Sequence, residues 1–220
     1  RLGANEAPPA IISVFLGEKL TQILENIQRG KVTKATNADL IDLGIFSLPT
    51  LSKDNTDRNR TSPFAFTGDK FEFRAVGSSQ NISFPAMVIN TIVAESLDEL
   101  AEKIKTKNSK NINQAVLEVL KEEISYSKAV LFNGDNYSRE WEIEAARRGL
   151  PNEKTTPTAL KALTTVKALN LFEKYQVLSN PELKSRQLIH VDRYIKDLEI
   201  EVKCLNTLCT SQIIPAAVVY

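Results

Sequence analysis

The sequence predicts an α+β fold, with a strand-rich first part (residues 1–85) followed by a mainly helical second part (residues 86–220). In the first part, glycine and proline residues separate short β-like runs, as in GANEAPP and FTGDKFEF. The second part repeats apolar residues at helical spacing with few interruptions. At 220 residues and 42% hydrophobic content, the chain has enough apolar material for a sizeable core in one large or two small domains.

The first part contains one predicted strand, one helix and one long loop before residue 63. The run AIISVFLG (10–17) is short, apolar and bounded by Pro9 and Gly17, which is typical of a buried strand. Residues 17–30 place leucine and isoleucine at helical spacing and reach Gly30, a typical helix end. Residues 51–62, LSKDNTDRNRTS, are polar without apolar periodicity and predict a loop.

Residues 67–80, TGDKFEFRAVGSSQ, alternate as in a strand. Lys70, Glu72 and Arg74 fall on one face, and Phe71 and Phe73 fall on the other, because strand side chains alternate with period two. We expect the two phenylalanines to pack against a core. The charged face has two interpretations: it faces water on a half-exposed sheet, or it lines a functional site.

The second part predicts a succession of helices. Apolar periodicity favours helices over 84–107, with Pro85 near the start, and over 111–131. FNGDNYS is a turn, and Ser138 is the expected cap of a short helix that stops at Gly149–Pro151. A helix opened by Thr-Pro is expected over 156–178. A long one, opened by Asn180 and Pro181, is expected over 180–214.

Composition excludes some classes of function. The net charge of +1 gives no general attraction to nucleic acid or membranes. We see no signal peptide and no apolar run near the roughly 20 residues of a span, so a cytoplasmic protein is expected. Cys204 and Cys209 are expected to be reduced, buried thiols, not a disulfide or zinc site. The sequence starts at Arg1, inside a motif, and ends without a polar tail. We therefore expect it to be part of a longer polypeptide.

Charged residues gather at three places in the first part. Arginine donates paired hydrogen bonds to carboxylates and phosphates, and a glutamate held between cations stays ionised, as a ligand of Mg²⁺ or Mn²⁺ must be. The chemistry therefore points to an anionic substrate, a phosphate and a divalent ion. The residues are Arg1 and Glu6 in RLGANEAPPA, Arg58 and Arg60 in DRNRTSPF, and Lys70, Glu72 and Arg74 in KFEFR.

The ordered motifs RLGANEAPPAI, NRTSPFAFTGDKFEFRAVGSSQ and SFPAMVINTIVA resemble the carboxy-terminal half of the glutamine synthetase catalytic domain. That family has an R-L…E-A-P loop, an N-R-S segment, an [RK]-x-E-x-R strand and an A-N-P-Y-like helix start. The type III class is most similar, through EAPPA, FTGDKFEFR and YSREWEIEAARRGLP. The resemblance covers essentially the whole chain. It implies an antiparallel sheet portion of the catalytic domain, followed by a helical layer and a type III helical extension.

The resemblance implies an ATP-dependent ligase that joins glutamate and ammonia through γ-glutamyl phosphate, in glutamine biosynthesis and nitrogen metabolism. Charge at the phosphoryl oxygens is neutralised by arginines and bound Mg²⁺ or Mn²⁺. By position, Arg1 matches the arginine that holds the substrate carboxylate. Glu6 matches the flap glutamate that helps deprotonate ammonium, and Arg60 matches the arginine on the transferring phosphoryl group.

Three further roles follow from the strand. Glu72 matches a ligand of the metal beside the nucleotide phosphates. Arg74 matches a second arginine near the substrate carboxylate and phosphate. Lys70 stands where the family usually has a nucleotide-phosphate arginine, so the charge is kept and the planar fork is lost.

The chain departs from the family pattern at several points. The interval from Arg1 to Glu6 is one residue short, and Ala65 stands where many members have an arginine, whose charge Arg58 is a candidate to supply. Other metal ligands, including a histidine, are expected upstream, so this chain alone should be inactive. His190 is expected to be an ordinary helix residue, and Trp141 to pack a helix.

Other functions stay open at this level. The parent protein is either catalytic, or a glutamine-synthetase-like domain kept for binding or assembly. Other candidates are a γ-glutamyl ligase acting on other amines and a guanidino kinase. The resemblance implies a large homo-oligomeric ring, a dodecamer in the parent, with glutamate, ammonia and ATP as its small-molecule partners. It implies neither nucleic-acid nor membrane binding.

Overall fold

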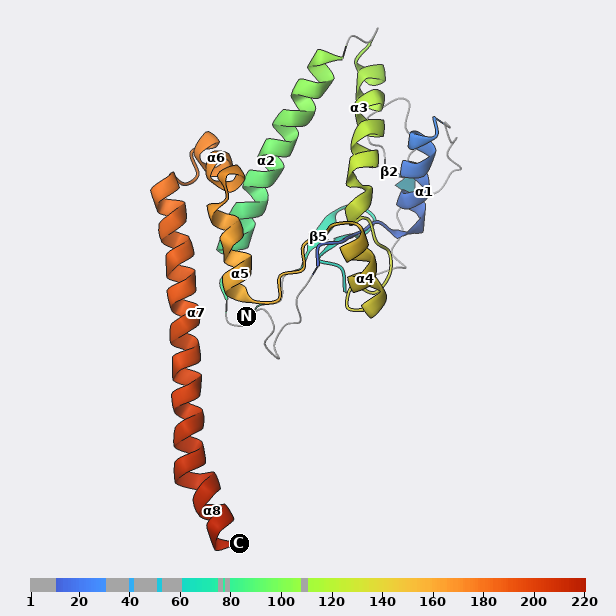
Figure 1. Ribbon diagram of the computed structural model, residues 1–220. Coiled ribbons are helices and arrows are strands. Elements are labelled where there is room, and N and C mark those ends of the chain that lie inside the picture. Colours follow the sequence, from blue (N-terminus) through green and yellow to red (C-terminus); the bar gives the residue numbers. More distant parts are fainter. Residues whose placement is uncertain are drawn as a thin grey trace. The chain divides into compact units, whose positions relative to one another are not determined.

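The computed structural model describes residues 11–30, 61–74, 77, 80–107 and 111–220, together with the backbone of 40–41 and 51–52. These residues fall into two compact units that divide between Asn152 and Glu153. Figure 1 shows the elements of each unit. The predicted boundary at residue 85 stays a prediction.

The first unit contains a small mixed sheet. Strands β1 (Val14–Phe15), β4 (Phe64–Phe66) and β5 (Phe71–Phe73) lie in the order β1-β4-β5. Strand β1 runs parallel to β4, and β4 runs antiparallel to β5. A separate antiparallel pair joins β2 (Leu40–Ile41) to β3 (Leu51–Ser52). The α+β class is therefore confirmed, but the sheet of the described residues is mixed because β1 and β4 are joined by a crossover that includes a helix.

Two predictions in this region need correction. The strand predicted over 10–17 is limited to Val14–Phe15 among the described residues. The loop predicted over 51–62 begins instead with strand β3, because Leu51 and Ser52 pair with the backbone of β2. Residues 53–60 of that loop lie outside the described part of the chain.

Helices α1 (Gly17–Gln28), α2 (Ser83–Thr106) and α3 (Ile112–Ser127) form the helical part of this unit. Helix α1 ends as predicted, with Gly30 at φ +69°, the left-handed conformation that glycine adopts without steric cost. Asn111 begins α3 by accepting a hydrogen bond from the Gln114 N–H at 2.8 Å. An ion pair of 2.6 Å between Lys103 and Glu123 links α2 to α3.

After α3 a single 3₁₀ turn, η1 (Lys128–Val130), leads to the loop before α4 (Arg139–Arg147). Ser138 caps α4 as predicted, because its hydroxyl accepts the Trp141 N–H at 3.2 Å. The helix stops at Gly149, which has φ +73°.

The second unit is entirely helical in its described residues. The helix predicted over 156–178 is two helices, α5 (Thr156–Leu160) and α6 (Val166–Lys174), with a 3₁₀ turn, η2 (Lys161–Thr164), between them. The single-helix prediction is wrong because Thr165 adopts an extended backbone and its hydroxyl accepts the Ala168 N–H at 3.3 Å. A threonine hydroxyl caps a new helix more favourably than it continues an old one.

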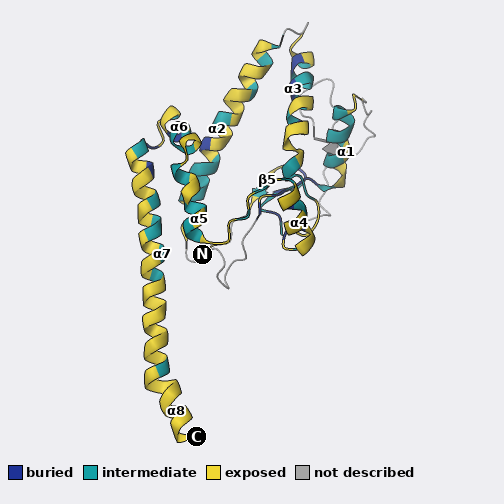
Figure 2. Cartoon of the chain, in the orientation of Figure 1, coloured by how far each residue is buried: buried dark blue, intermediate teal, exposed yellow. Residues whose placement is uncertain are grey.

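A continuous helical rod closes the chain. It comprises α7 (Asn180–Leu208), a π-helical turn η3 (Cys209–Ile213) and α8 (Ile214–Val219). Pro215 explains the π turn, because its ring cannot accept the regular helical path of the preceding turn. Leu183 is the one buried residue of α7. Figure 2 shows that the rest of the rod is mostly exposed.

By length and composition alone, the rod Asn180–Val219 is long and apolar enough to cross a membrane, with a mean hydropathy of 1.3 in its most apolar window. One such helix is a weak indication of a membrane span. The predicted absence of membrane binding therefore stays a prediction.

Cysteine and histidine predictions are borne out in part. Both cysteines are free thiols, but Cys204 is exposed and Cys209 half-buried, so the prediction of buried thiols is wrong. They lie on the rod, where few side chains are covered. His190 is a half-exposed residue of α7, as predicted.

Candidate functional site

The hairpin β4–β5 carries the described part of the predicted site. Its two-residue turn closes through a hydrogen bond from the Thr67 N–H to the Lys70 carbonyl at 2.9 Å. Gly68, the first central residue, has φ +96°, the conformation that a glycine-first hairpin turn requires. The register places Ala65 opposite Glu72. The turn therefore fixes which side chains of β5 share a face with Ala65.

Glu72 and Arg74 meet on that face. A guanidinium nitrogen of Arg74 donates to Oε2 of Glu72 at 2.8 Å, and the side chains are 25% and 32% exposed for Arg74 and Glu72 respectively. The Arg74 N–H donates to the Pro63 carbonyl at 2.8 Å, which extends the strand pairing. The prediction that Glu72 and Arg74 share one face is confirmed. The strand predicted over 67–80 is limited to Phe71–Phe73 among the described residues, because residues 67–70 form the hairpin turn. The roles assigned to Glu72 and Arg74 stay predictions.

Lys70 does not join this pair. Its side chain is 66% exposed, and its ammonium lies 4.0 Å from the Asp69 carboxylate at the turn. An exposed pair at this distance contributes little to stability.

The two faces of β5 are not buried as predicted. Phe71 is 54% exposed and Phe73 37% exposed, whereas Ala65 on the opposite face of the hairpin is 1% exposed. The phenylalanines instead pair across the hairpin, Phe73 with Phe64 at 5.1 Å and Phe71 with Phe66 at 5.3 Å between ring centroids. The prediction that they pack against a core is wrong, because this three-stranded sheet turns its small-residue face inward. Glu72 and Arg74 are therefore the half-buried side of the strand.

The remaining predicted site residues, Arg1, Glu6 and Arg60, lie outside the described residues. Arg58, the candidate substitute cation, does too. The structure therefore brings together Glu72 and Arg74 from the predicted set.

Asn136 is a candidate site residue that the sequence reasoning missed. It is 4% exposed, and neither its amide nitrogen nor its amide oxygen has a hydrogen-bond partner in the described part of the chain. Its backbone N–H donates to the Thr61 hydroxyl at 2.9 Å, which holds it beside the segment that follows Arg60 in sequence. A buried unsatisfied amide is rare enough in proteins to require an explanation. In sequence Asn136 was only one residue of the predicted turn FNGDNYS.

That turn packs on the sheet. The Phe132 N–H donates to the Val14 carbonyl at 3.1 Å. The Asn133 side chain accepts from the Leu16 N–H at 3.2 Å and donates to the Thr21 hydroxyl at 3.0 Å. A Cβ at Gly134 would lie 2.6 Å from the Phe132 ring, so this close turn requires glycine. The turn before α4 is thereby fixed against β1 and α1.

Trp141 anchors α4 beneath the turn. It is fully buried with Ile11 and Ala145, and its ring stacks on Phe132 at 4.2 Å. The Arg148 guanidinium lies 5.2 Å from the same ring. The prediction that Trp141 packs a helix is confirmed.

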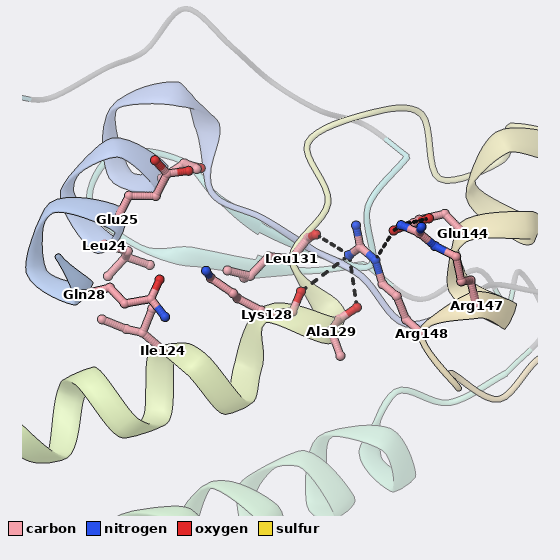
Figure 3. Close-up of a pocket in the computed structure, with 11 residues that line it drawn as sticks. Leu24, Glu25, Gln28, Ile124, Lys128, Ala129, Leu131, Glu144, Arg147 and Arg148 are labelled. Atoms are coloured by element: carbon pink, nitrogen blue, oxygen red, sulfur yellow. Dashed lines mark hydrogen bonds and ion pairs between the residues drawn. The ribbon is translucent and has the colours of Figure 1, made fainter.

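A pocket of about 480 Å³ lies between α1, the end of α3 and α4 (Figure 3). At one side Arg148 donates to the carbonyls of Ala129 at 3.2 Å and Leu131 at 2.8 Å. These bonds satisfy carbonyls at the end of the 3₁₀ turn. Glu144 accepts from Arg147 and Arg148, and these hydrogen bonds lower its pKa to about 2. The pocket includes none of the predicted site residues. Its lining is Thr21, Leu24, Glu25, Gln28, Ile124, Lys128, Ala129, Leu131, Glu144, Arg147 and Arg148.

Among the described residues there is no group of three or more histidine, cysteine, aspartate or glutamate side chains placed to hold a metal ion. Glu72 alone offers a carboxylate of the type that Mg²⁺ or Mn²⁺ prefers, held in place by Arg74. It fits a metal as one ligand of several, and further ligands have to come from elsewhere.

Comparisons with known proteins agree on one family. Residues 115–220 match the family model of the glutamine synthetase C-terminal domain. The chain is 47% identical over 98% of its length to the type-3 glutamine synthetase of Dictyostelium discoideum, and covers 30% of that protein. It is 41% and 37% identical, over its whole length, to glutamine synthetases of Bacteroides fragilis and Butyrivibrio fibrisolvens, and covers 31% of each.

The chain spans about 30% of the length of these relatives, so it corresponds to a segment of such a protein. The chain belongs to the glutamine synthetase family, and one of these relatives is a type 3 enzyme.

Proposed function

We propose that this chain is part of a glutamine synthetase, which uses ATP to join glutamate and ammonia through γ-glutamyl phosphate. The observation that carries the proposal is the 47% identity over 98% of the chain to a type-3 glutamine synthetase, together with the Glu72–Arg74 pair on β5. The activity belongs to the longer protein. Among the described residues, no histidine, cysteine or second carboxylate joins Glu72 in a group that could hold a metal ion.

The described residues support a charge-handling role for the hairpin. The Arg74 guanidinium donates to the Glu72 carboxylate at 2.8 Å, so β5 presents a fixed cation beside a fixed anion. The cation suits the substrate carboxylate or the phosphoryl group, and the anion suits a divalent ion. A bound Mg²⁺ or Mn²⁺ supplies charge neutralisation at the phosphate oxygens. Positioning of the two groups on one strand removes the need to order them at the moment of reaction.

The other assigned roles extend this arrangement. Arg1 binds the substrate carboxylate, and Glu6 accepts the proton of the attacking ammonium. Arg60 contacts the phosphoryl group in transfer, and Lys70 lies near the nucleotide phosphates. The whole protein is a cytoplasmic, ring-shaped homo-oligomer with glutamate, ammonia and ATP as its partners. The chain's net charge of +1 supports a protein without general affinity for nucleic acid.

The test replaces Glu72 in the protein expressed at its full natural length. Glu72→Ala should lower ATP-dependent glutamine formation by ~100-fold or more, because a charge-stabilising ligand is lost. Asp69→Asn is the matched control, because Asp69 is an exposed acid of the same hairpin and its carboxylate lies 4.0 Å from the Lys70 ammonium. It should keep nearly normal activity.

Two results decide between explanations. Near-normal activity of Glu72→Ala would remove Glu72 from the mechanism. A wild-type protein that binds glutamate or ATP but forms no glutamine would favour the binding or assembly alternative. A panel of small amines alongside ammonia separates a glutamine synthetase from a related γ-glutamyl ligase.

A further inference from the structure

The pocket between α1, the end of α3 and α4 is not used by the proposed reaction. Its volume of about 480 Å³ lies within the range of small-molecule sites, roughly 300–1,000 Å³. Every residue of its lining belongs to the first unit, and none of them is a predicted site residue. The pocket is therefore a candidate ligand site for which the proposed function gives no role.

Apolar side chains contribute one part of the lining. Leu24 comes from α1, Ile124 from α3, and Ala129 and Leu131 from η1 and the residue that follows it. Ile124 is 8% exposed, and the other three are half-buried. Such a lining favours a ligand with an apolar body, because binding then removes apolar surface from water on both partners.

The charges of the lining are unbalanced toward positive. Three cations stand against two carboxylates, Glu25 and Glu144. Both carboxylates already accept hydrogen bonds from arginines, Glu25 from Arg29 outside the lining at 3.1 Å, and Glu144 from Arg147 and Arg148. An anion is therefore the complementary ligand. The three cations are Lys128, Arg147 and Arg148.

Lys128 is the cation best placed to bind that anion. In Figure 3 its side chain extends from η1 toward Leu24 and Ile124. No hydrogen bond or ion pair joins its ammonium to the part of the chain that the structure describes. The residue is exposed, so a ligand can reach it. An ammonium group with free donors suits a carboxylate, through charge-assisted hydrogen bonds.

The same charge balance disfavours a ligand that carries an ammonium group. Glu25 and Glu144, the acidic side chains of the lining, already bind arginines. A ligand ammonium would compete with those arginines and would be repelled by Lys128. The pocket therefore suits a simple carboxylate better than an amino acid.

We propose that this pocket binds a small organic carboxylate with an apolar body. The carboxylate lies on the Lys128 ammonium, and the apolar body packs against Leu24, Ile124 and Leu131. This inference depends on the pocket alone and not on the proposed enzymatic activity.

The experiment titrates phenylpropionate into the protein expressed at its full natural length, with binding measured by isothermal titration calorimetry. Phenylpropionamide keeps the shape of this probe without its charge, acetate keeps the charge without the apolar body, and phenylalanine adds an ammonium group. Each of the three should bind at least about tenfold more weakly than phenylpropionate, because each loses one element of the match.

Two lysines of neighbouring sequence test the anion contact. Lys128→Gln should lower the affinity for phenylpropionate about tenfold and leave the affinity for phenylpropionamide unchanged, because only the acid pairs with the ammonium. Lys121→Gln, at an exposed position of α3 outside the lining, should change neither affinity. Both lysines are exposed, so folding is preserved, and circular dichroism verifies it.

Two apolar residues of α1 test the other half of the match. Leu24→Ala should lower the affinities for phenylpropionate and phenylpropionamide alike, at least about fivefold, because both probes share the apolar body. Ile23 is the half-buried neighbour that does not line the pocket, so Ile23→Ala should lower neither affinity.

Three outcomes would overturn the proposal. One is a wild-type protein that binds no phenylpropionate at millimolar concentrations. The second is an equal loss of phenylpropionate affinity in Lys128→Gln and Lys121→Gln. The third is phenylpropionate binding that is unchanged in Lys128→Gln and displaced by glutamate, because it would assign the probe to the substrate site.

Discussion

The two units of this chain differ in what holds their helices in place. In the first unit, α4 is fixed by a fully buried tryptophan, Trp141, and by a preceding turn that is bonded to the sheet. A buried hydrogen bond of 3.0 Å between Ser13 and Ser62 joins the segments beside β1 and β4. In the second unit, burial is concentrated at Phe172, Leu178 and Leu183, before most of α7 begins. Helix α4 is therefore held by side chains of its own unit. Most of α7, by contrast, has little buried surface among the described residues.

The largest expected effect is at the anchor of the first unit. Trp141→Ala should lower the free energy of unfolding by about 3–5 kcal/mol, because it removes a fully buried aromatic side chain and the stack on Phe132. Chemical denaturation followed by circular dichroism measures the change. The matched control is Val218→Ala, at an 80% exposed position of α8, where a change below about 0.5 kcal/mol is expected.

Equal losses of unfolding free energy in Trp141→Ala and Val218→Ala would contradict the difference described between the two units. This result would mean that the first unit draws its stability from contacts outside the Trp141 cluster. Hydrogen exchange localises the response: the loss of protection should be confined to α4 and the turn before it.

The second prediction concerns Asn136, whose buried amide has no hydrogen-bond partner among the described residues. Asn136→Ala should lower kcat/KM of the full-length enzyme at least about tenfold, because we interpret the amide as a group that hydrogen-bonds substrate near Thr61. Unfolding free energy should change little, because the described residues accept or donate no hydrogen bond at this side chain. Asn133→Ala is the contrasting variant, since its amide bonds Leu16 and Thr21.

The substitutions of the two asparagines should therefore affect different properties, stability in one case and activity in the other. Asn133→Ala should cost stability, about 1–2 kcal/mol for its two hydrogen bonds, more than it costs activity per folded molecule. If Asn136→Ala destabilises as much as Asn133→Ala and leaves kcat/KM unchanged, the amide is part of packing and not of the site.

Local signals explain which parts of the fold were predictable. Apolar periodicity and caps such as Asn111 and Ser138 act within one or two turns, so helices α1 to α4 and α7 follow from sequence. The Glu72–Arg74 pair follows too, because residues two apart on a strand share a face.

The failures have two causes: tertiary context, and local competition that periodicity does not measure. Nothing local tells that Phe71 faces outward and Ala65 inward, since either face of the hairpin can meet a core. The break at Thr165 depends on a competition between capping and continuing a helix, which periodicity does not measure. Asn136 becomes conspicuous only when packing against Thr61 removes it from water.

The third prediction uses pH to test how α4 is held. Glu144 has a pKa of about 2 against an ordinary 4.5, because Arg147 and Arg148 donate to its carboxylate. A lowered pKa stabilises the folded state at pH values above 4.5, and that stabilisation is lost as pH falls from 4.5 towards about 2. Glu144→Gln should therefore melt at a lower temperature than the wild type at pH 7, with the difference shrinking on acidification through this window.

Thermal melts of wild type and variant at pH 7, 4.5 and 3 provide the measurement. Glu140→Gln, at an exposed acid of the same helix, controls for the loss of a charge on α4. A melting difference between Glu144→Gln and wild type that is constant across this range would contradict the assigned ion pairs.

The smallest expected loss of stability comes from removing one helix cap in each unit. Ser179 begins α7, and its N–H and hydroxyl donate to the Glu182 carboxylate at 2.8 and 2.7 Å. Ser138 begins α4 through one bond to the Trp141 N–H. Ser179→Ala and Ser138→Ala should each cost about 1 kcal/mol, measured by denaturant unfolding.

Hydrogen exchange separates the two caps. In Ser138→Ala, protection should fall along all of α4, because a nine-residue helix has few other hydrogen bonds to resist fraying. In Ser179→Ala, the loss should stay within the first turn of α7, because the buried Leu183 holds the turn that follows. Fraying that spreads well past Leu183 would show that this buried contact does not hold the start of the helix.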